Sequence, residues 1–400
     1  MELRDHGALL IAIALGLLVM MASSAHGGDW ASLRAEAKQL FESGDHARAL
    51  ASATQALERA DMEFGHDDMN IALCLNDTAM ILEAVSGYAQ ALPMLERSLV
   101  IREAALGPQH ISLAVALNNL AGCCKALAQV SRAESLYLRA LAIRESNLGS
   151  AHPSVAASLN NLAALYTASG RYTEAESLYE RAVAVLEAAR GPEHLDVATS
   201  VSSLASLYAV QAQFDRAEPL YRRALAIRER TLGLFHPSVA ASAMNLAALR
   251  RNAGQYAEAE PLAARALTIM EASAGPEHPA VVAPLRECGA LAERQNRPAA
   301  AQRLFERALV ILERTHGSHD PAIVPALNDL ALLHASQRHF VIAEVGFRRS
   351  IAILETARGA ESAELVVPLK NLATVCRAGG RDAEADALEL RAARIQTGRR

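Results

Sequence analysis

Glycine recurs at a fixed interval along most of this chain. Eight glycines stand 42 residues apart, and no insertion breaks the interval: Gly65, Gly107, Gly149, Gly191, Gly233, Gly275, Gly317 and Gly359. A fixed period of this length is typical of a repeat architecture, in which each unit contacts only its neighbours. The 400 residues therefore predict one array of similar units and not two or three globular domains.

Small residues keep the same register. One column is alanine in every unit: Ala49, Ala91, Ala133, Ala175, Ala217, Ala259, Ala301, Ala343 and Ala385. A second column contains Ala37, Ala79, Ala121, Ala163, Ala205, Ala247, Gly289, Ala331 and Ala373. Hydrophobic residues make up 52% of the chain but aromatic residues only 4%, so the apolar content is mainly Ala and Leu. These residues favour helices, and small side chains allow helices to approach closely.

Residues 153–191 indicate what one unit contains. Pro153 is suited to the first turn of a helix, and an apolar stripe follows at helical spacing: Val155, Leu159, Leu162, Ala163 and Tyr166. Gly170 ends this helix, and a second stripe runs from Ala175 to Leu186. Gly191 is expected to close the second helix as a left-handed cap. The unit is therefore predicted to be an antiparallel pair of helices, each about 25 Å long.

These residues resemble the tetratricopeptide repeat at Leu162, Ala163, Tyr166, Ala175, Tyr179 and Ala182. The 42-residue length, the Gly-x-x-His-Pro linkers and the run Asn160-Asn161-Leu162-Ala163 are similar to the repeats of kinesin light chains. The resemblance covers residues 30 to about 396 and implies an all-α, right-handed α-solenoid of about nine antiparallel helix pairs. It also implies peptide binding by the solenoid. The motor-binding coiled coil of the kinesin proteins is absent.

The expected organisation has three parts. Residues 1–25 form a signal peptide or signal anchor, residues 26–396 form the solenoid, and residues 397–400 form a disordered tail. The units are roughly 30–65, 66–107, 108–149, 150–191, 192–233, 234–275, 276–317, 318–359 and 360–396. Glu36, Thr78 and the pair Cys288-Gly289 depart from the repeat pattern. Residues 382–396 are polar, as expected of a capping helix that keeps a solenoid soluble.

The N-terminus predicts export. Ala8 to Ala22 is an uncharged apolar run of 15 residues, followed by Ser23-Ser24-Ala25, a small-residue pattern that signal peptidases accept. Because a bilayer-spanning helix needs about 20 apolar residues, cleavage near Ala25 is favoured over a retained anchor. We therefore expect a bacterial protein that is periplasmic or secreted, with anchoring in the inner membrane as the alternative.

Several functions lack a sequence signal. A net charge of −5 gives no basic surface for nucleic acid. The five cysteines have no metal-binding or redox spacing and are expected to be small buried thiols, although Cys123-Cys124 leaves a redox pair open. His110, His152, His194, His236 and His278 lie in successive units, too far apart to share a metal, and are expected to cap helices or to contact linkers. Catalytic motifs are absent, so neither an enzyme, a cofactor nor a small-molecule substrate is expected.

The resemblance places the binding groove on the concave side, along the first helix of each unit. One outward column there contains Asn76, Asn118, Asn160 and Asn328, and the next contains Asn119, Asn161, Asn245 and Asn371. Asparagine is a poor helix former, and its amide can both donate to and accept from the backbone of an extended peptide. These amides are therefore candidate peptide-binding groups. The other interpretation is that they bond neighbouring helices and hold the repeats together.

Positive charge enters the same side in the C-terminal half, at Arg251, Arg286 and Lys370. Arginine supplies charge-assisted hydrogen bonds to carboxylates, so this half is predicted to prefer an acidic segment of the partner. A solvated surface without a ligand is the competing interpretation.

The sequence thus predicts an exported, non-catalytic scaffold that holds a peptide or protein segment in its concave groove. Two alternatives remain open. One is a membrane-anchored factor that retains residues 8–22 and assembles an envelope complex. The other is a structural spacer whose contacts lie on the convex side or at the ends of the solenoid.

Overall fold

The computed structural model describes residues 30–398, and the predicted signal at residues 1–25 lies outside this range. The described chain consists of α-helices joined by short turns, with three 3-10 turns and no strand among residues 30–398. It divides between Pro192 and Glu193 into two compact units. The all-α solenoid expected from the sequence is confirmed.

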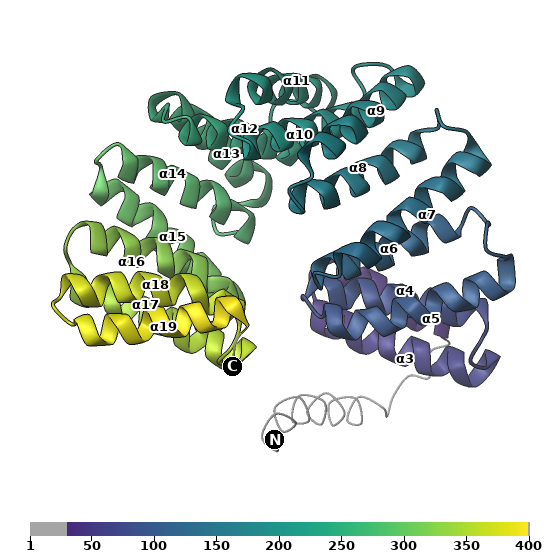
Figure 1. The fold of residues 1–400 in the computed structure, drawn as a ribbon, viewed down its shortest axis with the longest axis horizontal. Helices are drawn as coiled ribbons and strands as arrows, with labels where there is room; N and C mark the ends of the chain where they lie inside the picture. The colour runs from purple at the N-terminus through teal and green to yellow at the C-terminus, as the bar shows by residue number, and fades with distance from the viewer. Residues whose placement is uncertain (1–29, 399–400) are drawn as a thin grey trace. The chain divides into compact units, whose positions relative to one another are not determined.

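The first unit contains four helix pairs, drawn in purple to teal in Figure 1. They are α2 (Trp30–Glu42) with α3 (His46–Phe64), α4 (Met69–Ala84) with α5 (Tyr88–Leu106), α6 (Leu113–Ala126) with α7 (Val130–Leu148), and α8 (Pro153–Ala168) with α9 (Tyr172–Arg190). Each helix packs mainly on its own partner and then on the next pair along the chain. This is the nearest-neighbour packing that defines a repeat array.

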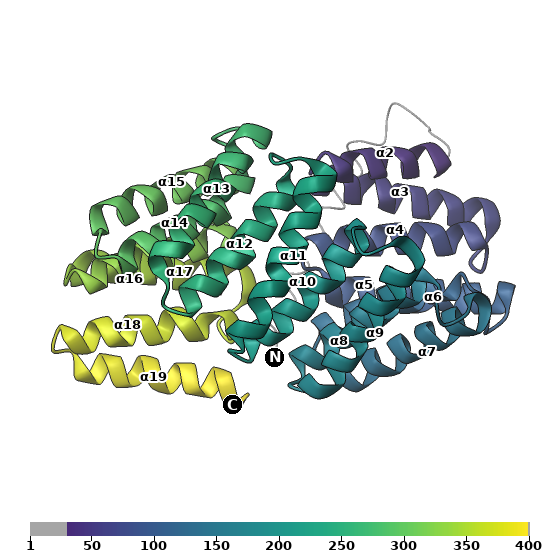
Figure 2. The same ribbon diagram turned by 90° about the horizontal axis from the view of Figure 1, so that it is seen from above.

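The second unit contains five pairs, shown again from above in Figure 2. They are α10 (Leu195–Val210) with α11 (Phe214–Leu232), α12 (Pro237–Asn252) with α13 (Tyr256–Ala274), α14 (Val282–Arg294) with α15 (Pro298–His316), α16 (Val324–Ser336) with α17 (Phe340–Arg358), and α18 (Val366–Ala378) with α19 (Asp382–Thr397). The final helix therefore continues one residue into the expected tail.

The first helices of the last three repeats, α14, α16 and α18, begin differently from those of the other repeats. A 3-10 turn precedes each of α14, α16 and α18, at Pro279–Val281, Pro321–Ile323 and Ala363–Leu365. Pro284, Pro325 and Pro368 follow these turns. Because proline has no N–H to give to the carbonyl four residues earlier, the regular helix starts only beside it. The three prolines were a signal of this in the sequence, but the apolar residues around them kept a helical period, and a continuous helix was expected.

The histidine column caps helices. Nδ1 of His152, His236 and His278 accepts the backbone N–H two residues later at 3.0–3.1 Å, and Asp320 does so at 2.7 Å in its place. Each bond satisfies one of the free N–H groups at a helix start. Capping, one of the two roles expected from the sequence, is therefore observed at these positions.

The glycine column has a backbone geometry that the sequence did not predict. Gly191 has φ 84° and ψ 158°, and its seven counterparts in the other repeats also have positive φ. The expected left-handed cap is wrong, because that conformation needs ψ near +47°. With ψ close to 160°, the residue lies in a region that is essentially restricted to glycine. The repeating glycine therefore turns the chain out of each second helix into the linker.

Arginine–carboxylate pairs join successive second helices. In the second unit, Glu229, Glu271, Glu313 and Glu355 each pair with the arginine 36 residues later at 2.5–2.7 Å. Arg349 also donates to the Ser318 carbonyl of the preceding linker at 2.8 Å. In the first unit, Asp61, Glu103 and Glu145 pair in the same way. One arginine per repeat thus ties a second helix to both the helix and the linker before it.

Several pairs of successive first helices approach each other closely. Cα atoms come within 8 Å between α2 and α4 and between α6 and α8 in the first unit. The same is true of α12 with α14, α14 with α16, and α16 with α18 in the second unit. Successive second helices are joined by the arginine–carboxylate pairs described above. We call the exposed residues of the first helices the inner face.

Candidate partner-binding surface

Small and uncharged side chains cover much of the inner face. In the first unit, α6 and α8 present the exposed Val115 and Ala157 and the half-buried Gly122 and Ala164. In the second unit, the equivalent positions of α10 and α12 carry Thr199, Ser206, Ala241 and Ala248. Few side chains project from this surface, so a partner's backbone can approach the helices closely. The asparagine columns lie between these small residues.

The asparagines are largely built into contacts between repeats. Nδ2 of Asn119 donates to Oδ1 of Asn76 at 2.9 Å, and Nδ2 of Asn245 approaches Oγ of Ser202 at 3.4 Å. Each bond joins a residue of one first helix to the residue 43 positions later on the next. These contacts support the interpretation that the amides hold neighbouring repeats together.

Some amides retain hydrogen-bonding capacity. Oδ1 of Asn118 and Oδ1 of Asn328 are buried and accept no hydrogen bond from residues 30–398. Both side chains are half-buried, as are Asn160 and Asn371, whereas Asn161 is exposed. A buried polar atom without a donor costs about 1–3 kcal/mol. Asn118 and Asn328 would therefore gain a hydrogen bond if the side chain turned outward to a donor supplied by a partner.

The predicted cationic residues also take part in the repeat contacts. Nε of Arg251 pairs with Oε1 of Glu287 at 2.7 Å, and Arg286 pairs with Asp329 across 43 residues. Their charges are thus offset by carboxylates within the same unit. Lys370 remains exposed and donates to Oε1 of Gln396 at 3.1 Å. The sequence placed these residues on the correct helices but did not identify Glu287 and Asp329 as their partners.

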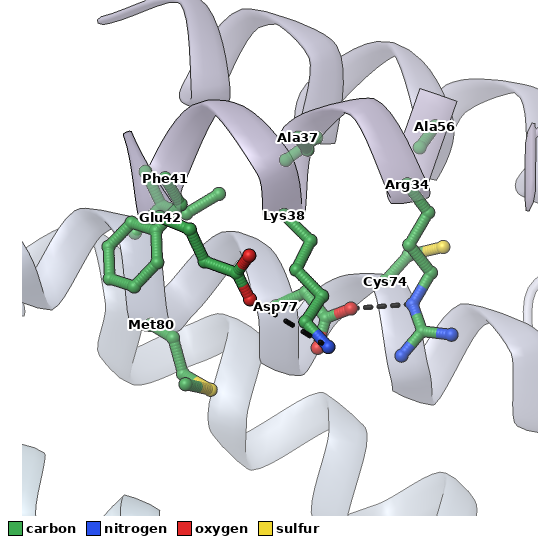
Figure 3. A pocket seen from close by; sticks show the side chains of 11 residues that line it. Arg34, Ala37, Lys38, Phe41, Glu42, Ala56, Cys74, Asp77 and Met80 are labelled. Carbon is green, nitrogen blue, oxygen red and sulfur yellow. Dashed lines mark hydrogen bonds and ion pairs between the residues drawn. The ribbon is translucent and has the colours of Figure 1, made fainter. Parts of the chain in front are cut away.

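A pocket of about 320 Å³ opens on the inner face at the first repeat, between α2, α3 and α4 (Figure 3). Phe41, Met80 and Ile81 line it, and Ala37, Ala53 and Ala56 are among the residues around it. Two ion pairs stand at its rim. Nε of Arg34 meets Oδ2 of Asp77 at 2.5 Å, and Nζ of Lys38 lies 4.0 Å from Oε1 of Glu42.

The pocket lies where the first repeat carries a small residue in a column that is large in most repeats. Ala53 occupies the column that holds Leu95, Tyr137 and Tyr179 in the next three units, where each is buried. Ala263, the other alanine of this column, is fully buried. The hollow at Ala53 therefore depends also on the residues around it between α2 and α4, such as Phe41 and Met80. A comparison of columns in the sequence contained this signal, but the prediction concentrated on the polar columns.

Burial disfavours ionised thiols. Cys74, Cys123, Cys124 and Cys376 are buried and free. Loss of solvent raises the pKa of Cys123 to about 12 and that of Cys74 to about 11. Because the thiolate is the reactive species, these side chains act as small apolar groups near neutral pH. No cluster of three metal-binding side chains occurs among residues 30–398, and no described helix is long and apolar enough to cross a bilayer.

Comparison with known proteins identifies the family. The family model of the tetratricopeptide repeat matches residues 31–104, 79–146, 154–237 and 238–314, which together exceed half of the chain. The protein therefore belongs to the tetratricopeptide repeat family. No curated protein matches the chain.

Several solved structures are similar to this chain, and the two with TM-scores above 0.5 have the same fold. A Podosopora anserina protein with nearly identical, kinesin light chain TPR-like repeats is 31% identical, with a TM-score of 0.46 over 52% of this chain and 98% of its own. The apo form of the quorum sensor NprR from B. thuringiensis has a TM-score of 0.56 at 11% identity, covering 91% of this chain and 98% of its own. The apo form of RapI has a TM-score of 0.55 at 12% identity, over 92% and 97%. Tetratricopeptide repeats generally serve as protein–protein interaction scaffolds.

Proposed function

We propose that the protein is a non-catalytic scaffold that binds a segment of another protein along its inner face. The pocket beside Ala53 carries this proposal. A hydrophobic hollow with charged groups at its rim suits a bulky apolar side chain on a polar backbone. The hollow lies between two first helices, beside Phe41 and Met80, on the side where a partner can reach it.

The small residues and amides of α6 and α8 extend this binding surface. A segment anchored beside Ala53 would continue over Val115 and Ala157, with Asn118 turning its amide outward to accept a backbone N–H. In the second unit, Asn328 offers the same group, and the exposed Lys370 ammonium favours a carboxylate on the partner. The proposed acidic preference is thus confined to the surface near α18, because Arg251 and Arg286 are already paired.

Affinity capture from the native cell envelope tests this function. The baits are residues 26–400, which we call the exported chain, and a variant of it with Asn118, Asn160 and Asn328 changed to Ala. A control bait carries Met62→Ala and Val100→Ala, which alter exposed apolar residues of second helices. A partner recovered with wild type and control, but lost from the asparagine variant, supports the inner face. Equal recovery on all three baits contradicts it.

We further propose that the chain is exported and that its signal is removed after Ala25. The support is the sequence Ala8–Ala22 with the small residues that follow. Intact-mass measurement of the native protein tests this proposal. A mature chain that begins at His26 supports export, whereas a chain that retains residues 8–22 favours the anchored alternative.

A further inference from the structure

Three exposed aliphatic side chains interrupt the repeat pattern on α17. Val341, Ile342 and Val345 are 77%, 54% and 63% exposed and lie within one and a half turns of the same helix. Single exposed apolar residues are ordinary on protein surfaces, but contiguous groups mark interaction sites. We call these three residues the α17 patch.

The repeat itself does not require these residues. In the third repeat, Ser131 and Ser135 stand at the positions of Val341 and Val345, and Arg132 stands at the position of Ile342. Arg132 forms an ion pair with Glu96, 36 residues earlier. At the patch, Ile342 replaces that arginine, and the equivalent Glu306 accepts from Gln302 of its own helix at 2.8 Å. An ion pair between repeats has been exchanged for exposed apolar surface.

Unpaired positive charge borders the patch. Arg303 on α15 and Arg338 in the turn before α17 are both exposed, and neither guanidinium forms an ion pair within residues 30–398. The nearest carboxylate on α17, Glu344, is held by Arg381 at 2.5 Å and by Arg348 at 2.9 Å. Glu306 of α15 is also exposed and forms no ion pair within residues 30–398. The available charge around the patch is therefore net positive, two arginines against one carboxylate, in contrast to the paired charges of the inner face.

The neighbouring helices leave the patch open from both sides. Ala299 of α15 and Ala383 of α19 occupy the same column as Val341 and are exposed. None of these aliphatic side chains can exchange hydrogen bonds with a peptide backbone, so an extended peptide would gain no backbone hydrogen bonds from them. A helix satisfies its backbone internally and needs only an apolar stripe to dock.

We propose that the α17 patch binds a short acidic amphipathic helix of another protein. Its apolar stripe would cover Val341, Ile342 and Val345, and its carboxylates would meet Arg303 and Arg338. This site lies on the second helices and does not depend on binding at the inner face. Variants that alter Ala53 or Asn118 are therefore expected to leave it intact.

Selection from a random library of 16-residue peptides tests the proposal, with the exported chain as the target. The patch variant carries V341A, I342Q and V345S. Each new side chain already occurs at the equivalent position of another repeat, as Ala299, Gln90 and Ser135. The control carries Met62→Ala and Val100→Ala in the first unit. Two further variants remove charge, Arg303→Ala and Arg338→Gly, and glycine suits the φ of 63° at position 338.

The expected peptides carry apolar residues three and four positions apart with Asp or Glu beside them. In fluorescence anisotropy, their affinity should fall at least tenfold on the patch variant and severalfold on each arginine variant, and remain unchanged on the control. Added salt should weaken binding to wild type more than to Arg303→Ala. The proposal is overturned if no peptide is enriched, if enriched peptides bind the patch variant as tightly as wild type, or if they lack acidic residues.

Discussion

Backbone conformation at single positions decides where each helix pair turns. Gly191 has φ 84° with ψ 158°, yet a Cβ added there would meet no atom within 4 Å. Gly191→Ala should therefore destabilise the fold by about 1–3 kcal/mol through backbone strain alone. Urea unfolding of the two proteins measures this difference. An unchanged midpoint would contradict the strain argument.

The turns between paired helices give the opposite prediction. Ala212 has φ 55°, at the position where other units have Gly170 and Gly254. A left-handed conformation costs a residue with a Cβ about 1–2 kcal/mol. Ala212→Gly should thus stabilise the protein despite the greater freedom of the unfolded chain, giving a net gain of up to about 1 kcal/mol. A higher urea midpoint is expected, and a lower one would show that the turn is not strained.

Gly289 stands where other units have alanine because Phe305 lies against it. A Cβ at position 289 would lie 2.4 Å from Cε1 of Phe305. Gly289→Ala should cost about 1–3 kcal/mol by overpacking. The same change made together with Phe305→Leu should cost clearly less, because leucine vacates that space. A double-mutant cycle measured by urea unfolding checks the coupling, and additive effects would reject it.

Glu344 makes part of the stability dependent on pH. Hydrogen bonds from Arg381 and Arg348 lower the pKa of this carboxyl to about 2. Because the folded-state pKa is below the unfolded one, the stabilisation is complete above pH 4.5 and is lost as pH falls towards 2. Glu344→Gln should therefore cost roughly 1 kcal/mol at pH 7, after allowance for solvent screening, and progressively less below pH 4.5. A difference that stays constant down to pH 3 would contradict this assignment.

At the scale of the element, the sequence predicted most of what makes a helix pair. The apolar stripes and the alanine columns indicated both helices and their crossing, and Ala163 and Ala175 are fully buried there. Of the two roles expected for the linker histidines, capping and linker contact, capping is the one observed. Such features depend on residues close together in the chain, and sequence periodicity reports those directly.

Contacts between elements were harder to predict. The sequence suggested that Asn76 and Arg286 face a ligand, but both contact the next first helix, through Asn119 and Asp329. The pairing depends on an offset of 43 residues, which only the stacked geometry reveals. The arginine ladder of the second helices, at an offset of 36, was missed for the same reason. Periodicity within one unit cannot show which residues of two units meet.

The cap column permits a test at this scale. Nδ1 of His236 accepts from the Ser238 N–H at 3.0 Å at the start of α12. His236→Ala should cost about 1 kcal/mol, whereas His236→Asp should preserve the cap, as Asp320 does in its own unit. Thermal unfolding of the two variants distinguishes capping from a mere linker contact. Equal losses in both would exclude the capping role.

For the whole molecule, the constant 42-residue spacing predicts that one repeat can be removed without disturbing the contacts of the others. Deleting residues 108–149 removes α6 and α7 and brings the column of Glu103 to the arginine column at Arg181. Since units contact only their neighbours, this deletion should preserve cooperative unfolding and helicity per residue. A 21-residue deletion of residues 129–149 should not, because it leaves an unpaired first helix. Circular dichroism with thermal melting compares the two.

Binding at the inner face is the central claim, and filling the pocket tests it most directly. Ala53→Leu places in the first repeat the residue that Leu95 provides in the second, so it should keep or raise stability while removing the anchor site. The measurement is the dissociation constant of the captured partner on wild type and on Ala53→Leu. We predict that affinity falls at least tenfold with no loss of thermal stability. Equal affinity on both proteins would contradict the account and move the binding site away from the inner face.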